Sequence, residues 1–162
     1  MKPIIGIIGK YDKVYNHKVI FGYNSLFDKI IESGGIPIII KDINDIKVDG
    51  IILQGGSDID KNELPVVKYA YQNDIPLLGI CLGMQTIGNY FNGKLKRVFN
   101  HNVSGVDKVH EVVLNKNSKI YEILGSNLIV NSRHNYALTN TDLNVGGISL
   151  DGVIEEIEDK SK

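Results

Sequence analysis

The sequence holds a single cysteine, Cys81, among 162 residues. One cysteine excludes an internal disulfide and a zinc site built from several thiolates, and this favours a reducing compartment. The formal net charge is only -1, so the usual electrostatic support for binding a polyanion is lacking. No run of about 18 apolar residues occurs, and the apolar N-terminal stretch is shorter than a secretory signal. These features predict a cytoplasmic protein without a membrane span or a nucleic-acid partner.

Several binding motifs are also missing. No Gly-x-Gly-x-x-Gly follows the first predicted strand, and no Gly-Lys-Ser/Thr loop occurs, so neither a dinucleotide nor a nucleoside triphosphate is implied. The spacing of His, Cys, Asp and Glu does not match a metal site, and Asp58 and Asp60 fit turn or cap positions better than ligand positions. We therefore expect no cofactor and no metal.

The composition is that of an ordinary globular protein, with 43% hydrophobic and 23% charged residues. A chain of this length buries roughly two-thirds of the surface that it exposes when unfolded, but it does not accommodate two full domains. We expect one domain over residues 1–162.

Short isoleucine-rich blocks alternate with helical patterns over the first two-thirds of the chain, as in a parallel sheet with crossover helices. The last third has strand patterns and an Asp151-Gly152 pair, which is typical of a tight hairpin. The predicted strands cover residues 3–9, 36–40, 49–53, 75–80, 109–114 and 128–131. The predicted helices begin near Tyr23, near Asn62 and directly after Cys81. The fold class is α/β: a flavodoxin-like three-layer fold, with a mostly parallel sheet flanked by helices and an antiparallel C-terminal extension.

Cys81 lies where a predicted strand meets a predicted helix, in Gly79-Ile80-Cys81-Leu82-Gly83. A nucleophile on such a sharp turn projects beyond the carboxyl end of the sheet, where open α/β sheets bind ligands. The turn needs neighbours without bulk, which Gly79 and Gly83 supply. The start of the helix favours the thiolate over the thiol. Core packing of a small apolar cysteine is the commoner role, but it does not require these glycines.

A second glycine pair, Gly55-Gly56, follows a neighbouring predicted strand. Its backbone can turn amides toward a ligand above the sheet, as an oxyanion hole requires. Together with the amide of Leu82, it would form a site with two or more donors beside Cys81.

These segments resemble the class I glutamine amidotransferase-like cysteine hydrolases, closest to the γ-glutamyl-γ-aminobutyrate hydrolase (peptidase C26-like) branch. The resemblance implies that Cys81 attacks a γ-glutamyl amide to form a thioester, which water hydrolyses. It also implies that Gly55, Gly56 and Leu82 form the oxyanion hole and that Gln85 holds the glutamyl group. It rests on these segments: 34–37, 50–58, 79–85, 130–134 and 151–155.

Family members carry a His-Pro-Glu segment after the final hairpin, and its His and Glu complete a catalytic triad. No His-Pro pair occurs in this sequence. General-base catalysis is worth on the order of 10² to 10⁴ in rate, so this difference from the family matters, and three explanations stay open. Either the sequence is truncated, or the protein is a non-catalytic relative, or an internal histidine has replaced the missing base.

Four histidines are available for that role. His17 and His101 lie in polar surroundings and are expected to be solvated, and His110 is expected to be structural. His134 is the catalytic candidate, because by the resemblance its segment approaches the substrate. The related branch has His-His-Gln where this chain has His134-Asn135-Tyr136. We therefore expect Asn135 and Tyr136 to contact the substrate because of their position in the sequence, and not because their residue types match those of the branch.

Glu155 is the carboxylate to consider. Strand alternation places it on the same face as Val153 and Ile157, where a buried carboxylate requires a partner. We assign Glu155 to the substrate pocket; the alternative is a strand edge kept soluble by charge.

The predicted function is cysteine-dependent hydrolysis of a small γ-glutamyl amide. The alternative is a binding or regulatory domain that has lost the triad His and Glu. A synthetase partner or a homo-oligomer is compatible with the sequence but not indicated by it.

Overall fold

The structure is a computed structural model that describes residues 1–43, 47–57 and 62–161. The chain forms two compact units, residues 1–87 and 88–162, and each is described by itself. Asp58 and Asp60, predicted as turn or cap residues, lie outside the described residues.

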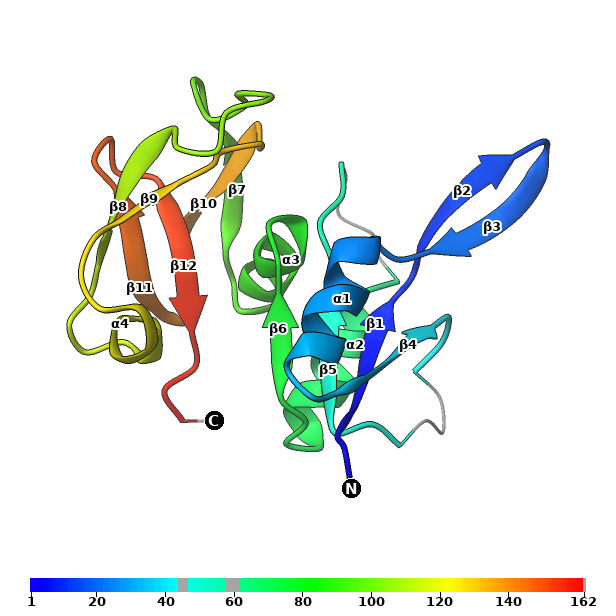
Figure 1. Cartoon of the computed structure of the whole chain (residues 1–162). Helices are drawn as coiled ribbons and strands as arrows, with labels where there is room; N and C mark the ends of the chain where they lie inside the picture. Colours follow the sequence, from blue (N-terminus) through cyan, green and yellow to red (C-terminus); the bar gives the residue numbers. More distant parts are fainter. Residues whose placement is uncertain (44–46, 58–61, 162) are drawn as a thin grey trace. The chain divides into compact units, whose positions relative to one another are not determined.

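A four-stranded parallel sheet forms the centre of the first unit (Figure 1). Its strand order is β4-β1-β5-β6, which means that the chain starts in the middle and adds strands on both sides. All three pairings are parallel. The strands are β1 (Ile4–Ile8), β4 (Ile36–Ile40), β5 (Gly50–Leu53) and β6 (Leu77–Gly79). The predicted parallel sheet is therefore confirmed.

Helices lie on both faces of this sheet, with α1 (Asn24–Glu32) in front and α2 (Leu64–Gln72) behind in Figure 1. Ile30 of α1 packs with Ile7 and Ile52, which are paired across neighbouring strands. Pro65 lies in the first turn of α2, where its missing amide costs no hydrogen bond. The third helix, α3 (Leu82–Tyr90), follows β6 after Ile80 and Cys81.

The inner face of α2 does not include Tyr71, which is 39% exposed. The buried residues of this helix are Val66, Val67 and Ala70. The small Ala70, not the larger tyrosine, therefore faces the interior.

A β-hairpin that the sequence patterns did not indicate follows β1. It consists of β2 (Lys10–Val14) and β3 (His17–Phe21), and it extends away from the parallel sheet (Figure 1). Its two-residue turn, Tyr15-Asn16, has φ values of 47° and 65°. His17 is exposed, as predicted.

The second unit is built on an antiparallel sheet of order β12-β11-β8-β9. These strands are β8 (His110–Leu114), β9 (Leu128–Val130), β11 (Asn144–Ser149) and β12 (Ile154–Glu158). A separate antiparallel pair joins β7 (Lys94–Arg97) and β10 (Tyr136–Asn140). A short helix, α4 (Lys119–Leu124), starts at Ser118, whose hydroxyl accepts from Tyr121 N at 3.2 Å.

The hairpin predicted around Asp151-Gly152 is present between β11 and β12. Its loop is closed by Ser149 N donating to Val153 O at 2.9 Å. The overall class is thus α/β and flavodoxin-like, with a mostly parallel sheet flanked by helices and an antiparallel C-terminal part. None of the helices in the described residues has the length and apolar character needed to cross a membrane.

Candidate functional site

Cys81 occupies the turn between β6 and α3, with a φ of 52°, and its side chain is exposed. A non-glycine residue adopts this left-handed conformation at an energetic cost and is held there by its surroundings. The first helical hydrogen bond follows directly, since Gln85 N donates to Cys81 O at 3.1 Å. The thiol therefore sits at the positive end of the helix dipole, which favours its anionic form.

The glycines on either side of Cys81 are required by close backbone approach. A Cβ on Gly79 would overlap the Gly83–Met84 peptide, and a Cβ on Gly83 would overlap the Leu53 carbonyl oxygen. Because α3 starts so close to the ends of β5 and β6, only residues without side chains fit at these positions.

The Gly55-Gly56 loop lies beside this turn. β5 and β6 are paired, and Ile80 N donates to Leu53 O at 2.9 Å just before the two strands end. A Cβ built on Gly55 would lie 3.8 Å from the Cβ of Cys81, and one on Gly56 would contact Leu82. The structure thus brings Gly55, Gly56 and Leu82 together around Cys81. Gln85 is on the same helix and 6% exposed.

A buried ion pair next to the turn was missed by the sequence analysis. Glu63, 1% exposed, pairs with the ammonium of Lys10. Its other oxygen accepts from the Thr86 hydroxyl on α3 at 3.3 Å. Thr86 also donates to Leu82 O at 3.0 Å, so this network reaches the first turn of α3. No local pattern marks these three residues, because they come from separate segments.

Gln54 is a second missed residue, and it is completely buried. Its amide donates to Ile8 O at 2.8 Å and to Phe21 O at 3.0 Å, and it accepts from Tyr23 N at 3.0 Å. It therefore ties the base of the β2–β3 hairpin and the start of α1 to the end of β5, directly before Gly55.

The remaining predicted residues lie in the second unit. His134 and Asn135 precede β10, Tyr136 begins it, and Glu155 is on β12. Tyr136 is 49% exposed, and the Asn135 side chain accepts from Asn102 at 3.1 Å. His134 Nε2 is 3.5 Å from Glu155 Oε2. An inward carboxylate at Glu155 was expected to need a partner, and the structure places His134 opposite it.

His101 was expected to be solvated, and this prediction is wrong. It is 2% exposed, with Nε2 3.0 Å from Asp151 Oδ2 and Nδ1 3.2 Å from Glu155 Oε1. Ser132 donates to its backbone oxygen at 2.8 Å. Burial of the imidazole is tolerated because a carboxylate faces each of its two nitrogens.

Three side chains of the second unit have shifted pKa values. Burial opposes protonation of His134, but the Glu155 carboxylate outweighs it and raises the pKa of His134. A hydrogen bond from Ser149 and the ring of His101 lower the pKa of Asp151 to about 2. Burial, reinforced by the charge of Glu158, raises the pKa of Glu156 to about 7. The pKa shifts of His134 and Asp151 therefore arise in part from contacts between imidazoles and carboxylates, whereas that of Glu156 does not.

The predicted residues thus form two groups. Cys81, Gly55, Gly56, Leu82 and Gln85 gather in the first unit, and the others gather in the second. The sequence profile of the glutamine amidotransferase class-I family matches residues 21–162. The chain belongs to this family.

Relatives of this glutamine amidotransferase domain agree with that assignment. A Schizosaccharomyces pombe protein placed by its name among glutamine amidotransferases is 32% identical, and the match covers 82% of this chain and 67% of that protein. The γ-glutamyl-CDP-amidate hydrolase of Campylobacter jejuni is 32% identical over 70% of this chain and 56% of its own length. A solved Thermoplasma acidophilum structure, named for one of the GMP synthase subunits, shares the fold with a TM-score of 0.76 at 23% identity, covering 100% of this chain and 80% of that chain.

Proposed function

We propose that this glutamine amidotransferase-family chain hydrolyses the amide bond of a small γ-glutamyl compound, with Cys81 as the nucleophile. The observation that carries the proposal is the exposed thiol at a positive φ, held between two glycines that close backbone contacts require. A cysteine that served only as packing would need neither feature.

In the proposed reaction, the Cys81 thiolate attacks the γ-carbonyl carbon and the carbonyl electrons move onto oxygen. Amides from the Gly55-Gly56 loop and Leu82 stabilise this oxyanion, each contributing about 3 to 4 kcal/mol in comparable sites. When the tetrahedral intermediate collapses, the C–N bond breaks and a protonated amine or ammonia leaves. Water then attacks the resulting γ-glutamyl thioester, releasing glutamate and restoring the thiol.

The γ-glutamyl substrate is supported by the family and by the name of the Campylobacter jejuni relative, which is a γ-glutamyl-CDP-amidate hydrolase. Gln85, close to Cys81 in the first turn of α3, is the proposed contact of the glutamyl group.

A histidine must give a proton to the leaving amine, and His134 is the candidate from the sequence. The nucleophile part of the proposal does not depend on that choice. It requires only that Cys81 reacts with γ-glutamyl carbonyls.

The test uses the full chain, a γ-glutamyl anilide and an electrophilic glutamine analogue. We expect release of the aniline and covalent labelling at Cys81, both falling to background in Cys81→Ala. Tyr15→Ala, at the exposed tip of the β2–β3 hairpin, is the control. A protein that gives neither turnover nor labelling is a binding or regulatory domain, and the proposal is then wrong.

A further inference from the structure

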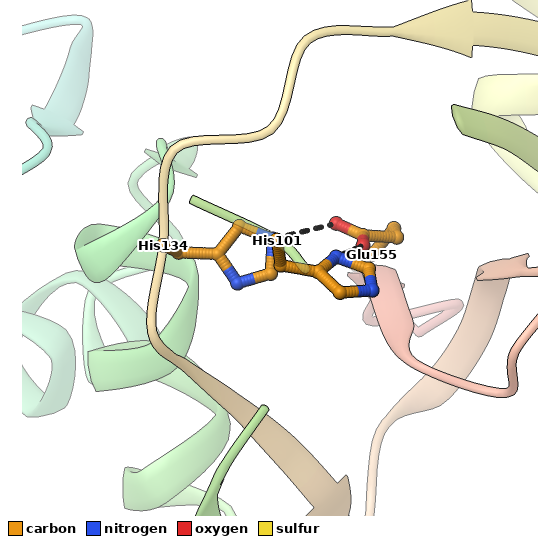
Figure 2. A group of neighbouring side chains, drawn as sticks. All are labelled: His101, His134 and Glu155. Carbon is orange, nitrogen blue, oxygen red and sulfur yellow. Dashed lines mark ion pairs between the residues drawn. The ribbon is translucent and has the colours of Figure 1, made fainter. Parts of the chain in front are cut away.

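Three side chains of the second unit converge on one point, although they are far apart in sequence. Figure 2 shows His101 and His134 facing the carboxylate of Glu155. His101 Nδ1 lies 3.2 Å from Glu155 Oε1, and His134 Nε2 lies 3.5 Å from Glu155 Oε2. One donor atom from each of the three residues lies within 4.8 Å of the others.

The facing atoms are buried but poorly hydrogen bonded. Within the described part of the chain, His134 Nε2 and Glu155 Oε1 make no hydrogen bond, although each lies within ion-pair distance of a facing group. His110 Nε2, which borders the group at 3.5 Å from Glu155 Oε1, also makes no hydrogen bond there. Buried polar atoms are normally paired, so these atoms indicate a missing partner at the centre of the group.

The outer ring nitrogens, in contrast, have acceptors. His101 Nε2 lies 3.0 Å from Asp151 Oδ2, and His134 Nδ1 lies 3.0 Å from Tyr136 O. A carboxylate or a backbone carbonyl on the far nitrogen is the usual arrangement of metal-binding histidines, because it fixes the tautomer and leaves the inner nitrogen as a lone-pair donor. His101 Nδ1 also lies 3.2 Å from the Ser132 hydroxyl, but that hydroxyl donates to His101 O.

The spacing suits a small divalent cation. Zinc bonds of about 2.0 to 2.1 Å in a tetrahedron place neighbouring ligand atoms about 3.3 Å apart. His101 Nδ1 lies 3.2 Å from Glu155 Oε1 and His134 Nε2 lies 3.5 Å from the other oxygen, Oε2, while one donor atom from each of the three residues lies within 4.8 Å of the others. Two imidazole nitrogens and one carboxylate form a ligand set that suits Zn²⁺ and Co²⁺ better than Ca²⁺ or Mg²⁺.

We propose that His101 Nδ1, His134 Nε2 and Glu155 bind a divalent transition-metal ion of the zinc type, with Asp151 orienting His101. The fourth position is open to water or to a ligand that carries an oxygen or nitrogen donor. His134 is then a metal ligand and not the base for Cys81. The inference concerns the second unit and does not depend on the proposed hydrolysis.

The test is a Co²⁺ titration of the full chain, purified with chelator and followed by visible absorption. We expect one equivalent per chain, the visible bands of a four-coordinate site and no charge-transfer band from thiolate. Glu155→Gln and His134→Asn should abolish these bands. The proposal is wrong if the wild-type protein does not bind, or if both variants bind as it does.

Two controls separate this site from other donors. Cys81→Ala removes the thiol, and His17→Ala removes an exposed histidine of β3; both variants should bind Co²⁺ like the wild type. Loss of binding in either one would overturn the assignment.

Asp151→Asn tests the orienting role without touching a ligand, and Asp151 is exposed, so the variant is expected to fold. Affinity for Co²⁺ should fall by about 10- to 100-fold with the same spectrum, as is found for comparable outer partners. Unchanged affinity would remove Asp151 from the site. Circular dichroism of every variant verifies that a lost signal does not come from unfolding.

Discussion

Cys81 is exposed because two residues near it have no side chain. Gly83 lies so close to β5 that a Cβ would overlap the Leu53 carbonyl oxygen, which is backbone and has little freedom to move. We expect Gly83→Ala to lower the free energy of unfolding by about 1 to 3 kcal/mol, as overpacking does in well-packed interiors. Labelling of Cys81 should fall as well, because the turn must shift to accommodate the new atom. Urea unfolding and the labelling rate measure the two effects.

Gly55→Ala is the matched control for that substitution. Its Cβ would lie 3.8 Å from the Cβ of Cys81, an ordinary van der Waals distance. The free energy of unfolding should therefore change by less than about 1 kcal/mol. If Gly55→Ala destabilised the protein as much as Gly83→Ala, close backbone approach would not be the reason for glycine near Cys81.

The Cys81 turn and the buried His101 differ in how far the sequence alone predicts them. The cysteine turn was predictable, because Gly79, Cys81 and Gly83 are local and their spacing carries the geometry. His101 was not, because its neighbours in sequence are polar while its partners, Asp151 and Glu155, come from the β11–β12 hairpin region. Burial of a polar side chain is decided by such distant partners, and a single sequence does not reveal them.

At the scale of elements, the ion pair of Lys10 and Glu63 joins β2 to the start of α2, and Thr86 adds α3. We expect Glu63→Ala to lower the free energy of unfolding by about 3 kcal/mol, because it leaves the Lys10 ammonium, only 12% exposed, without its partner. Urea unfolding monitored by circular dichroism tests this.

The exposed pair Lys29 and Glu32 on α1 provides the control. Its side chains are 77% and 61% exposed, so Glu32→Ala should change the free energy of unfolding by no more than about 0.5 kcal/mol. If Glu63→Ala and Glu32→Ala lowered the free energy of unfolding equally, burial would not be the reason why loss of a partner from the Lys10–Glu63 pair is costly.

The β2–β3 hairpin is the element that the sequence patterns failed to indicate. Two-residue hairpin turns with both φ values positive are usually marked by Asn-Gly or Asp-Gly. Here Tyr15 takes the first position, so the signature is absent, although Asn16 suits the second. The flanking residues are also largely exposed, so no apolar alternation identifies them as strands. By contrast, the strands of the parallel sheet are rich in isoleucine and leucine, and this composition alone predicted them, although only β5 is buried along its whole length.

At the scale of the whole molecule, the predicted site residues divide between units 1–87 and 88–162. The proposed metal ion should stabilise one region of the chain more than the rest. The elements that hold the ion cannot open without releasing it, so a bound ion stabilises these elements most. With Zn²⁺ present, amide hydrogen exchange in the full chain should slow in residues 101–155, where the three ligands lie. It should change much less in β1, β4, β5 and β6. Mass spectrometry of peptides from the intact exchanged protein locates the effect.

Glu155→Gln sharpens this prediction, since it replaces the ligand that faces both histidines while keeping nearly the same shape. In that variant, Zn²⁺ should leave the exchange of residues 101–155 unchanged, whereas Cys81→Ala should retain the full slowing. Slowing that persists in Glu155→Gln, or that centres on the Cys81 turn in the wild type, would place the ion elsewhere.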